Sequence, residues 1–364
     1  MRKKKRTALL WPTLLAVTII LSLLGLFFVF ESSTAESYIK YSHQYHFIKA
    51  QGISFLLGFV ALIAAFCTPM WIWKKISIVL FFASILLLLS VFIPGVGIEL
   101  NGAQRWILIN GRSFQPIEFM KLSMVLFFAN YLSKKVNIKS FLFFTSLISI
   151  ILLLQPDMGS LLIVIWIAFG MFFVAGGSIS EMLLTCCAGG IILLLLVLTS
   201  SYRMRRLKTF FNPEQDLLGA SFHIQQIKLA LGNGGLIGQG IGNSKQKLLY
   251  IPEASSDSIF AIMAEEIGFV GSLFILFLYS LYFYVAYQIA RKLPPGSFNQ
   301  LVAYGILLWI SGQTFINLGA IVSLIPLTGL PLPFFSYGGS SLITVLFGSG
   351  ILARLAYRAS SGSK

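Results

Sequence analysis

Carboxylates gather in one short stretch of the chain, Tyr250 to Glu266. The chain has only twelve Asp and Glu residues, and four of them lie in this stretch: Glu253, Asp257, Glu265 and Glu266. The stretch runs into an apolar segment, where an ionised carboxylate is costly and usually marks a functional site. We therefore expect polar chemistry at the mouth of a membrane helix.

The loop that ends in this stretch, Ser201 to Ser258, has seven Lys and Arg residues against four Asp and Glu residues, a net charge of +3. Anionic lipid headgroups explain such a charge. The alternative is an anionic substrate bound by cations such as Lys245 and Lys247, because Lys and Arg beside carboxylates commonly bind phosphate. The glycine-rich run Gly232 to Gly242 lacks the strand and helix of a nucleotide-binding turn. It is expected to bend the backbone tightly, and its N–H groups offer a further place for an anion.

Charged residues also lie at the ends of other apolar runs. Arg105 stands beside a tryptophan in an outside loop. Glu118 and Lys121, three residues apart, share one helix face. Such a pair inside a span should face the bundle interior or a water-filled cavity, and a purely structural ion pair is the alternative. Asp157, in Gln155-Pro156-Asp157, is interpreted either as a helix N-cap or as a site residue.

The stretch Leu324 to Ser341 holds three prolines and a Gly-Gly pair between two apolar runs, so it cannot be regular helix. Irregular backbone at membrane depth is tolerated only where protein buries it or where it lines a cavity. We predict a re-entrant turn that forms one wall of the site. Ser336 and Ser340 supply hydroxyl groups for substrate there.

Composition places these residues in an integral membrane protein. Hydrophobic residues make up 57% of the 364 residues, charged residues 11%, and the mean hydropathy is +0.86. The predicted fold is a single all-α polytopic membrane domain over residues 1–364, with ten transmembrane helices and a large extracytoplasmic loop, 201–258, between helices 7 and 8. The ten apolar runs are Leu9–Phe30, Ile48–Cys67, Ile76–Ile93, Ile117–Leu132, Phe141–Leu154, Ser160–Gly176, Met182–Thr199, Ile259–Ala290, Leu301–Ile321 and Ser340–Tyr357.

The charge distribution sets the orientation. With a cytoplasmic N-terminus, fifteen Lys and Arg residues lie inside and only four lie in the short outside loops. The basic N-terminus (residues 1–8) and the tail (residues 358–364) are then both cytoplasmic. The net charge of +15 follows the loops of a membrane protein, so no nucleic-acid partner is expected.

Six segments together resemble motifs of the SEDS family (shape, elongation, division and sporulation): GAQRW, FQPIEFMK, QPDMG, YIPEASSD, FAIMAEEIG and PLTGLPLPFFSYGGSS. The resemblance covers nearly the whole chain. It implies a ten-helix polymerase in which the essential aspartate is Asp257 and the other motif positions are Arg105, Glu118 and Lys121. The sequence departs from the family motif around the aspartate, with Ser255-Ser256 in place of His-Thr and Ser258 in place of Phe.

The resemblance also implies the reaction and its partners. SEDS proteins polymerise lipid II into glycan strands on the extracytoplasmic side of the bacterial cytoplasmic membrane, with a class B penicillin-binding protein as the transpeptidase. The segment GNSKQKLLYIPEA is closer to the division members than to the elongation members, which implies septal synthesis beside other divisome membrane proteins. An elongation-type polymerase is the alternative within the family.

The residues support a mechanism for that reaction. Asp257 would accept the proton of the attacking sugar hydroxyl, while Arg105, Lys121, Lys245 and Lys247 would stabilise the leaving pyrophosphate. Of the three aspartates in the chain, only Asp257 lies where a basic loop meets an apolar helix.

Three questions stay open at this point. Glu253 could share a helical face with Asp257, so whether the two bind a divalent cation such as Mg²⁺ or Mn²⁺ is not settled. A flippase of the lipid-linked precursor is the alternative activity. A scaffold without enzyme activity is the third interpretation.

Overall fold

The computed structural model describes residues 9–100, 103–109, 112–198, 204, 209–211, 221–248, 250–251 and 253–361. The part described is mostly helical, as predicted, and each of the ten predicted apolar runs overlaps one helix. The helices are α2 (Leu10–Tyr41), α3 (His46–Cys67), α4 (Met70–Ser90), α5 (Pro116–Leu132), α6 (Ile138–Leu154), α7 (Met158–Val174), α8 (Ile179–Leu198), α10 (Phe222–Gly234), α11 (Ile259–Lys292), α12 (Phe298–Ile321) and α13 (Gly339–Ser361).

Several of these helices are suited to a bilayer. Within the described residues, α2, α3, α4, α11, α12 and α13 are each long and apolar enough to cross a membrane. The helices α6 and α7 and the first part of α8 are shorter and also apolar. The chain is therefore a multi-pass membrane protein.

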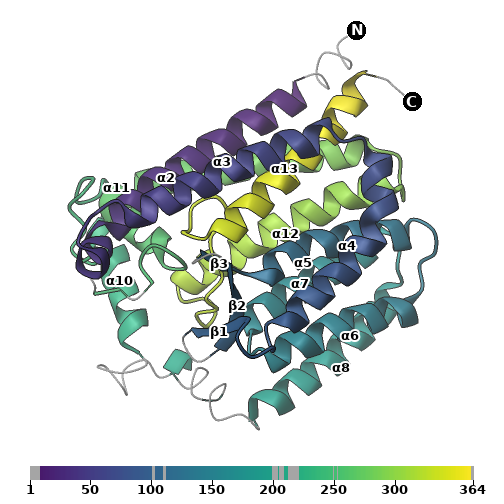
Figure 1. Cartoon of the computed structure of the whole chain (residues 1–364), viewed down its shortest axis with the longest axis horizontal. Coiled ribbons are helices and arrows are strands. Elements are labelled where there is room, and N and C mark those ends of the chain that lie inside the picture. Colours follow the sequence, from purple (N-terminus) through teal and green to yellow (C-terminus); the bar gives the residue numbers. More distant parts are fainter. Residues whose placement is uncertain are drawn as a thin grey trace.

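The helices lie side by side in a bundle, with α2, α3 and α13 along one side and α6 and α8 at the opposite side (Figure 1). The rings of Trp11 and Tyr357 lie 5.9 Å apart, and Phe66 is 5.8 Å from Trp11, between centroids. The start of α2, the end of α3 and the end of α13 therefore meet at one end of the bundle. This is the arrangement that the prediction of both termini on one side requires.

Helix α5 forms the centre of the bundle. It contacts α4, α7, α12 and α13, and every residue of α5 except Phe119 and Tyr131 is buried. A helix that is apolar on all faces is expected to be enclosed by others. Any charged residue on α5 is therefore placed in the interior of the protein.

The loop between α4 and α5 contains a small antiparallel sheet, so the expectation of a purely helical protein was wrong there. Its strands are β1 (Gly97–Leu100), β2 (Ala103–Ile109) and β3 (Arg112–Phe114), in the order β1-β2-β3. Ile107 pairs with Gly97 on one side and with Phe114 on the other. The sequence has Asn-Gly at 101–102 and again at 110–111, a strong hairpin signal between short apolar runs.

The glycine-rich run 232–242 packs against a break in α11. Gly268 interrupts that helix with φ 66° and ψ −168°, a conformation that favours glycine. The N–H of Gly240 donates to the carbonyl oxygen of Glu266 at 3.0 Å. A Cβ on Gly238 would lie only 2.1 Å from the same oxygen. The expected tight bend is therefore present, and it brings two backbones into direct contact.

Candidate functional site

Asp257 lies at the N-terminal end of α11, in the turn just before the helix begins, and its side chain is half-buried. The Oγ of Ser258 donates to Asp257 Oδ1 at 3.4 Å. On the other side, the Nδ2 of Asn317 on α12 donates to the Asp257 carbonyl oxygen at 2.8 Å. A Cβ on Gly329 would lie 3.8 Å from Asp257 Oδ2. Helix α12 and the segment after it thus hold this aspartate in place.

The segment between α12 and α13, residues 322–338, is free of helix and strand, which confirms the prediction for residues 324–338. The prediction was wrong for residues 339–341, because α13 already begins at Gly339. We call residues 322–338 the re-entrant segment. It lies directly beside the Asp257 loop: the Tyr337 N–H donates to the Ser255 carbonyl oxygen at 2.8 Å, and the Ser336 hydroxyl donates to the Ser256 carbonyl oxygen. Ser336 Oγ also accepts from the Leu332 N–H at 2.6 Å. The hydroxyl of Ser336 therefore links two pieces of backbone, and its contact with substrate stays a prediction.

Side chains of neighbouring helices satisfy the carbonyl groups of the re-entrant segment. Asn317 Nδ2 donates to Leu330 O at 2.7 Å, Gln313 Nε2 donates to Pro331 O at 2.8 Å, and the Tyr279 hydroxyl donates to Pro333 O. Irregular backbone in a membrane protein needs such partners, because no water replaces them in the hydrocarbon region. The two amides of α12 are therefore what allows this segment to enter the bundle.

Two glycines make room for the segment. A Cβ on Gly25 of α2 would lie 2.1 Å from the carbonyl oxygen of Phe334, and one on Gly159 of α7 would lie 2.7 Å from that of Thr328. Contacts this short exclude any larger residue without movement of the backbone. The re-entrant segment thus packs against α7 at Thr328 and against α2 at Phe334.

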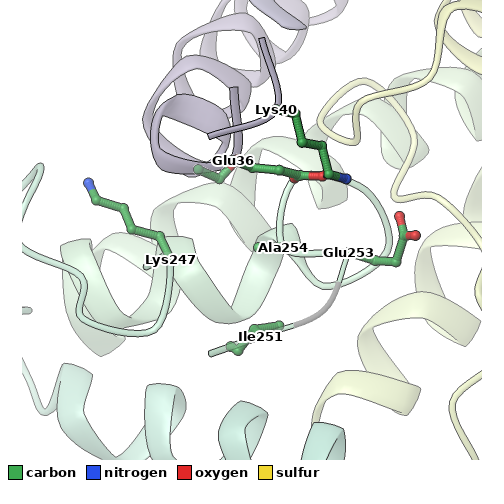
Figure 2. Close-up of a pocket in the computed structure, with 7 residues that line it drawn as sticks. Glu36, Lys40, Lys247, Ile251, Glu253 and Ala254 are labelled. Atoms are coloured by element: carbon green, nitrogen blue, oxygen red, sulfur yellow. The ribbon is translucent and has the colours of Figure 1, made fainter. Parts of the chain in front are cut away.

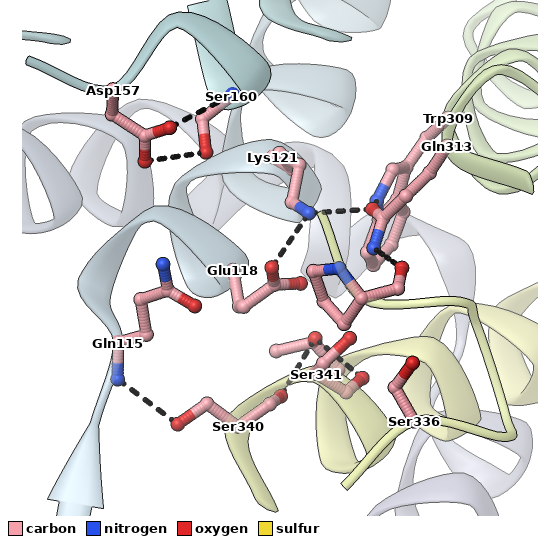
Figure 3. A network of polar contacts seen from close by, with 12 residues as sticks. Gln115, Glu118, Lys121, Asp157, Ser160, Trp309, Gln313, Ser336, Ser340 and Ser341 are labelled. Carbon is pink, nitrogen blue, oxygen red and sulfur yellow. Dashed lines mark hydrogen bonds and ion pairs between the residues drawn. The ribbon is translucent and has the colours of Figure 1, made fainter. Parts of the chain in front are cut away.

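Glu118 and Lys121 form an ion pair in the centre of the bundle, as Figure 3 shows. Lys121 Nζ lies 2.8 Å from Glu118 Oε1 and donates to Gln313 Oε1 at 2.6 Å, and the two charged side chains are 1% and 0% exposed. The Trp309 ring lies 5.6 Å from Lys121 Nζ. Glu118 Oε2 has no hydrogen-bond partner among the described residues. The prediction that the pair faces the bundle interior is confirmed.

Through Gln313, this pair is connected to the Asp257 loop. Gln313 accepts from Lys121 and donates to Pro331, and the preceding carbonyl, Leu330 O, is held by Asn317. Neither amide was predicted from the sequence. The sequence signal for them was two amide side chains four residues apart on one face of an apolar run. Buried amides in such a helix are expected to hydrogen-bond to other elements.

Arg105 and Asp157 form a second cluster. Arg105 donates from Nε to the Gln155 carbonyl oxygen at 3.2 Å and also donates to the Pro156 carbonyl oxygen. Its Nη1 lies 3.8 Å from Asp157 Oδ1. Asp157 accepts from the Ser160 N–H at 3.1 Å at the start of α7, so its interpretation as an N-cap is confirmed. In this structure Arg105 secures the turn that begins α7.

Two of the remaining sequence candidates, Ser340 and Lys247, are also buried. Ser340 Oγ accepts from the Gln115 N–H at 3.0 Å (Figure 3). Lys245 is exposed. Lys247 Nζ lies 2.8 Å from Glu266 Oε1 and 3.3 Å from Glu31 Oε2. Glu31, on α2, was not a sequence candidate, because nothing in the sequence places α2 beside the loop that carries Lys247.

A cavity of about 260 Å³ opens between the end of α2 and the loop before Asp257 (Figure 2). The Lys40 ammonium lies 2.6 Å from Glu36 Oε1, whereas the Lys247 ammonium points away from that pair. Among the described residues, no group of three or more His, Cys, Asp or Glu side chains is placed to hold a metal ion. A divalent cation at Glu253 and Asp257 stays a hypothesis. The cavity is lined by Ser32, Glu36, Lys40, Lys247, Ile251, Glu253 and Ala254.

Comparison with known proteins decides the family. The family model described as "Cell cycle protein", which groups FtsW, RodA and SpoVE, matches residues 12–361. The chain belongs to this family. This is the SEDS family that the sequence motifs indicated, and that prediction is confirmed.

The SEDS relatives match over nearly their full length. Stage V sporulation protein E of Bacillus subtilis (strain 168) is 38% identical over 349 residues, which cover 93% of this chain and 94% of that protein. A Geobacter sp. (strain M18) protein named "Probable peptidoglycan glycosyltransferase FtsW" is 36% identical over 352 residues, covering 94% of this chain and 96% of that protein.

Solved structures have the same fold. A chain from a structure described as "Structural coordination of polymerization and crosslinking by a peptidoglycan synthase complex" matches with a TM-score of 0.78 and 27% identity, covering 95% of this chain and 97% of that one. The rod shape determining protein RodA of Thermus thermophilus matches with a TM-score of 0.69 and 27% identity, covering 95% of this chain and 96% of that one. The SEDS fold thus extends over the whole bundle.

Proposed function

We propose that this SEDS protein is a peptidoglycan glycosyltransferase that joins lipid II units into glycan strands. The observation that carries the proposal is the placement of Asp257, a half-buried carboxylate at the N-terminal end of a membrane helix. The turn that contains it is held by hydrogen bonds from Asn317, Ser336 and Tyr337. Relatives that are 34–36% identical to this chain are named probable peptidoglycan glycosyltransferases, which supports the same activity.

The proposed reaction needs one proton acceptor. A hydroxyl group of the acceptor sugar attacks the anomeric carbon of the donor, and the bond from that carbon to the lipid pyrophosphate breaks. Asp257 takes the hydroxyl proton as general base.

The departing pyrophosphate needs positive charge. Lys245 is exposed on the same loop, and Lys247 lies in it, held by Glu31 and Glu266. Lys121 and Arg105 are bound to protein groups in this structure, so their proposed contribution is to position the re-entrant segment and the start of α7. Direct contact of these two cations with substrate stays a prediction.

The proposal includes a partner and a location. A transpeptidase of the class B penicillin-binding type would crosslink the strands, and the likeness to a chain from a complex that coordinates polymerization and crosslinking supports this pairing. The FtsW names of relatives support work at the division septum beside other divisome membrane proteins. The active site would face the extracytoplasmic side of the bacterial cytoplasmic membrane.

That location depends on ten spans with the loop 201–258 outside. In a variant whose native cysteines are replaced by alanine, we expect a single cysteine at Ser42, after α2, to react with a membrane-impermeant thiol reagent in intact cells. A single cysteine at Asn137, before α6, should stay unlabelled until the cells are permeabilised. Labelling of the Asn137 position in sealed cells would contradict this topology.

The decisive test of activity uses purified protein and lipid II in detergent, alone and with a class B partner. Glycan strands of increasing length are expected, because polymerisation needs no second compartment. A flippase makes no product under these conditions, and a scaffold makes none without another polymerase. Absence of strands with correctly folded protein and partner would contradict the proposed activity.

A further inference from the structure

A histidine of α10 reaches the Asp257 loop through a serine. His223 is the second residue of α10, and its Nε2 lies 2.8 Å from the Oγ of Ser258. The side chain of Ser258 is fully buried, and the same Oγ donates to Asp257 Oδ1. Ser258 is one of the positions where this sequence departs from the family motif. The three side chains come from two elements, α10 and the turn before α11.

The chemistry of the hydroxyl group fixes the direction of these bonds. A serine hydroxyl has one proton to donate and can accept through its lone pairs. If that proton points to Asp257, the bond to His223 requires a proton on Nε2 of the imidazole. The resulting order is His223 Nε2–H to Ser258 Oγ, and Ser258 O–H to Asp257 Oδ1. The distance of 3.4 Å in the second step exceeds that of an ordinary O–H···O bond, and contacts of catalytic groups are often long before substrate binds.

Helix α10 is firmly seated, so it can position a side chain. Its residues Ile224, Ile227 and Ala230 are buried. A Cβ on Gly234 would lie 2.2 Å from the Ala264 carbonyl oxygen, so α10 contacts the backbone of α11 directly. Movement of the imidazole relative to the Asp257 turn is restricted by this contact.

We propose that His223 and Ser258 are positioning residues that orient the Asp257 carboxylate for proton transfer. The proposal rests on the proposed function and assigns a role to two residues that its mechanism does not use. During the reaction the sugar hydroxyl loses its proton to Asp257, and His223 keeps its own. The pair selects one orientation of the carboxylate, so its loss lowers kcat and leaves binding of lipid II unchanged.

The test compares polymerisation kinetics of His223→Ala, Ser258→Ala and the double variant with those of the parent. Each single change is expected to lower kcat about tenfold with KM for lipid II unchanged, a smaller loss than the roughly hundredfold that a misplacement of about 1 Å can cause. The double variant should be no slower than either single variant, because the two residues act in one chain of bonds. His223→Gln keeps a side-chain N–H donor and should restore kcat to within about threefold of the parent.

The control is His43→Ala, which removes an exposed histidine elsewhere and should leave kcat unchanged. Thermal unfolding of every variant is measured in the same detergent, and the Gln variant supplies a folded comparison if His223→Ala is unstable. Parental kcat for both alanine variants, or a double variant whose loss is the product of the single losses, would overturn the inference. The variant Asp257→Asn distinguishes failure of this inference from failure of the proposed function. If Asp257→Asn is inactive while the alanine variants have normal kcat, only the positioning role of His223 and Ser258 is wrong. If Asp257→Asn is active, the proposed mechanism itself is wrong.

Discussion

Replacement of Asp257 by Asn is expected to lower the rate of lipid II polymerisation by about a hundredfold or more, the usual scale for loss of a positioned general base. The amide keeps the size of the side chain and accepts the Ser258 hydrogen bond, but it cannot take the proton of the sugar hydroxyl. The bond from Asn317 to the Asp257 carbonyl oxygen involves backbone and should persist. The measurement is strand formation from lipid II by the purified variant.

Two comparisons make the result specific. Asp216→Asn removes a negative charge from the same polar loop and should leave the rate near that of the parent. Thermal stability and binding of a class B partner should match the parent for both variants, which excludes misfolding. Near-parental polymerisation by folded Asp257→Asn protein would remove Asp257 as the base, and Glu253 would be the next candidate.

The sequence predicts those parts of the structure that depend on local pattern. Apolar runs of membrane length located the helices, because each helix must satisfy its own backbone in hydrocarbon. The spacing of Glu118 and Lys121 placed them on one face of α5, and the prolines at 326, 331 and 333 excluded a helix over residues 324–338. Each of these inferences used only neighbours in the chain.

The parts that the sequence did not predict depend on contacts between distant residues. Gln313 and Asn317 resembled ordinary polar residues of an apolar helix until the re-entrant segment was placed against α12. His223 lies 35 residues from Ser258 in the chain, and no periodicity connects them. The strands β1, β2 and β3 could have been predicted, since the sequence has Asn-Gly at 101–102 and at 110–111, but their short apolar runs resembled ordinary loop.

The second large effect is expected on protein stability, when the buried ion pair of Glu118 and Lys121 is broken. Lys121→Met is expected to lower the free energy of unfolding by about 3–5 kcal/mol, because it leaves Glu118 as an uncompensated buried charge. The Glu118 side chain has no other hydrogen-bond partner among the described residues. Glu118→Gln should cost less, since Lys121 keeps its bond to Gln313. The measurement is unfolding by SDS in mixed micelles for the purified variants.

The double variant distinguishes a coupled pair from two independent charges. With Glu118→Gln and Lys121→Met together, no unpaired charge remains, so the loss should be smaller than the sum of the single losses. Lys40→Met is the matched control: its partner Glu36 lies on the same helix at 2.6 Å, but the lysine side chain is 59% exposed, and an exposed pair contributes about 1 kcal/mol or less. Additive losses at positions 118 and 121 would contradict the coupling. The double variant should still polymerise slowly, because Gln313 loses its bond to Lys121 and holds Pro331, and through it the Asp257 loop, less firmly.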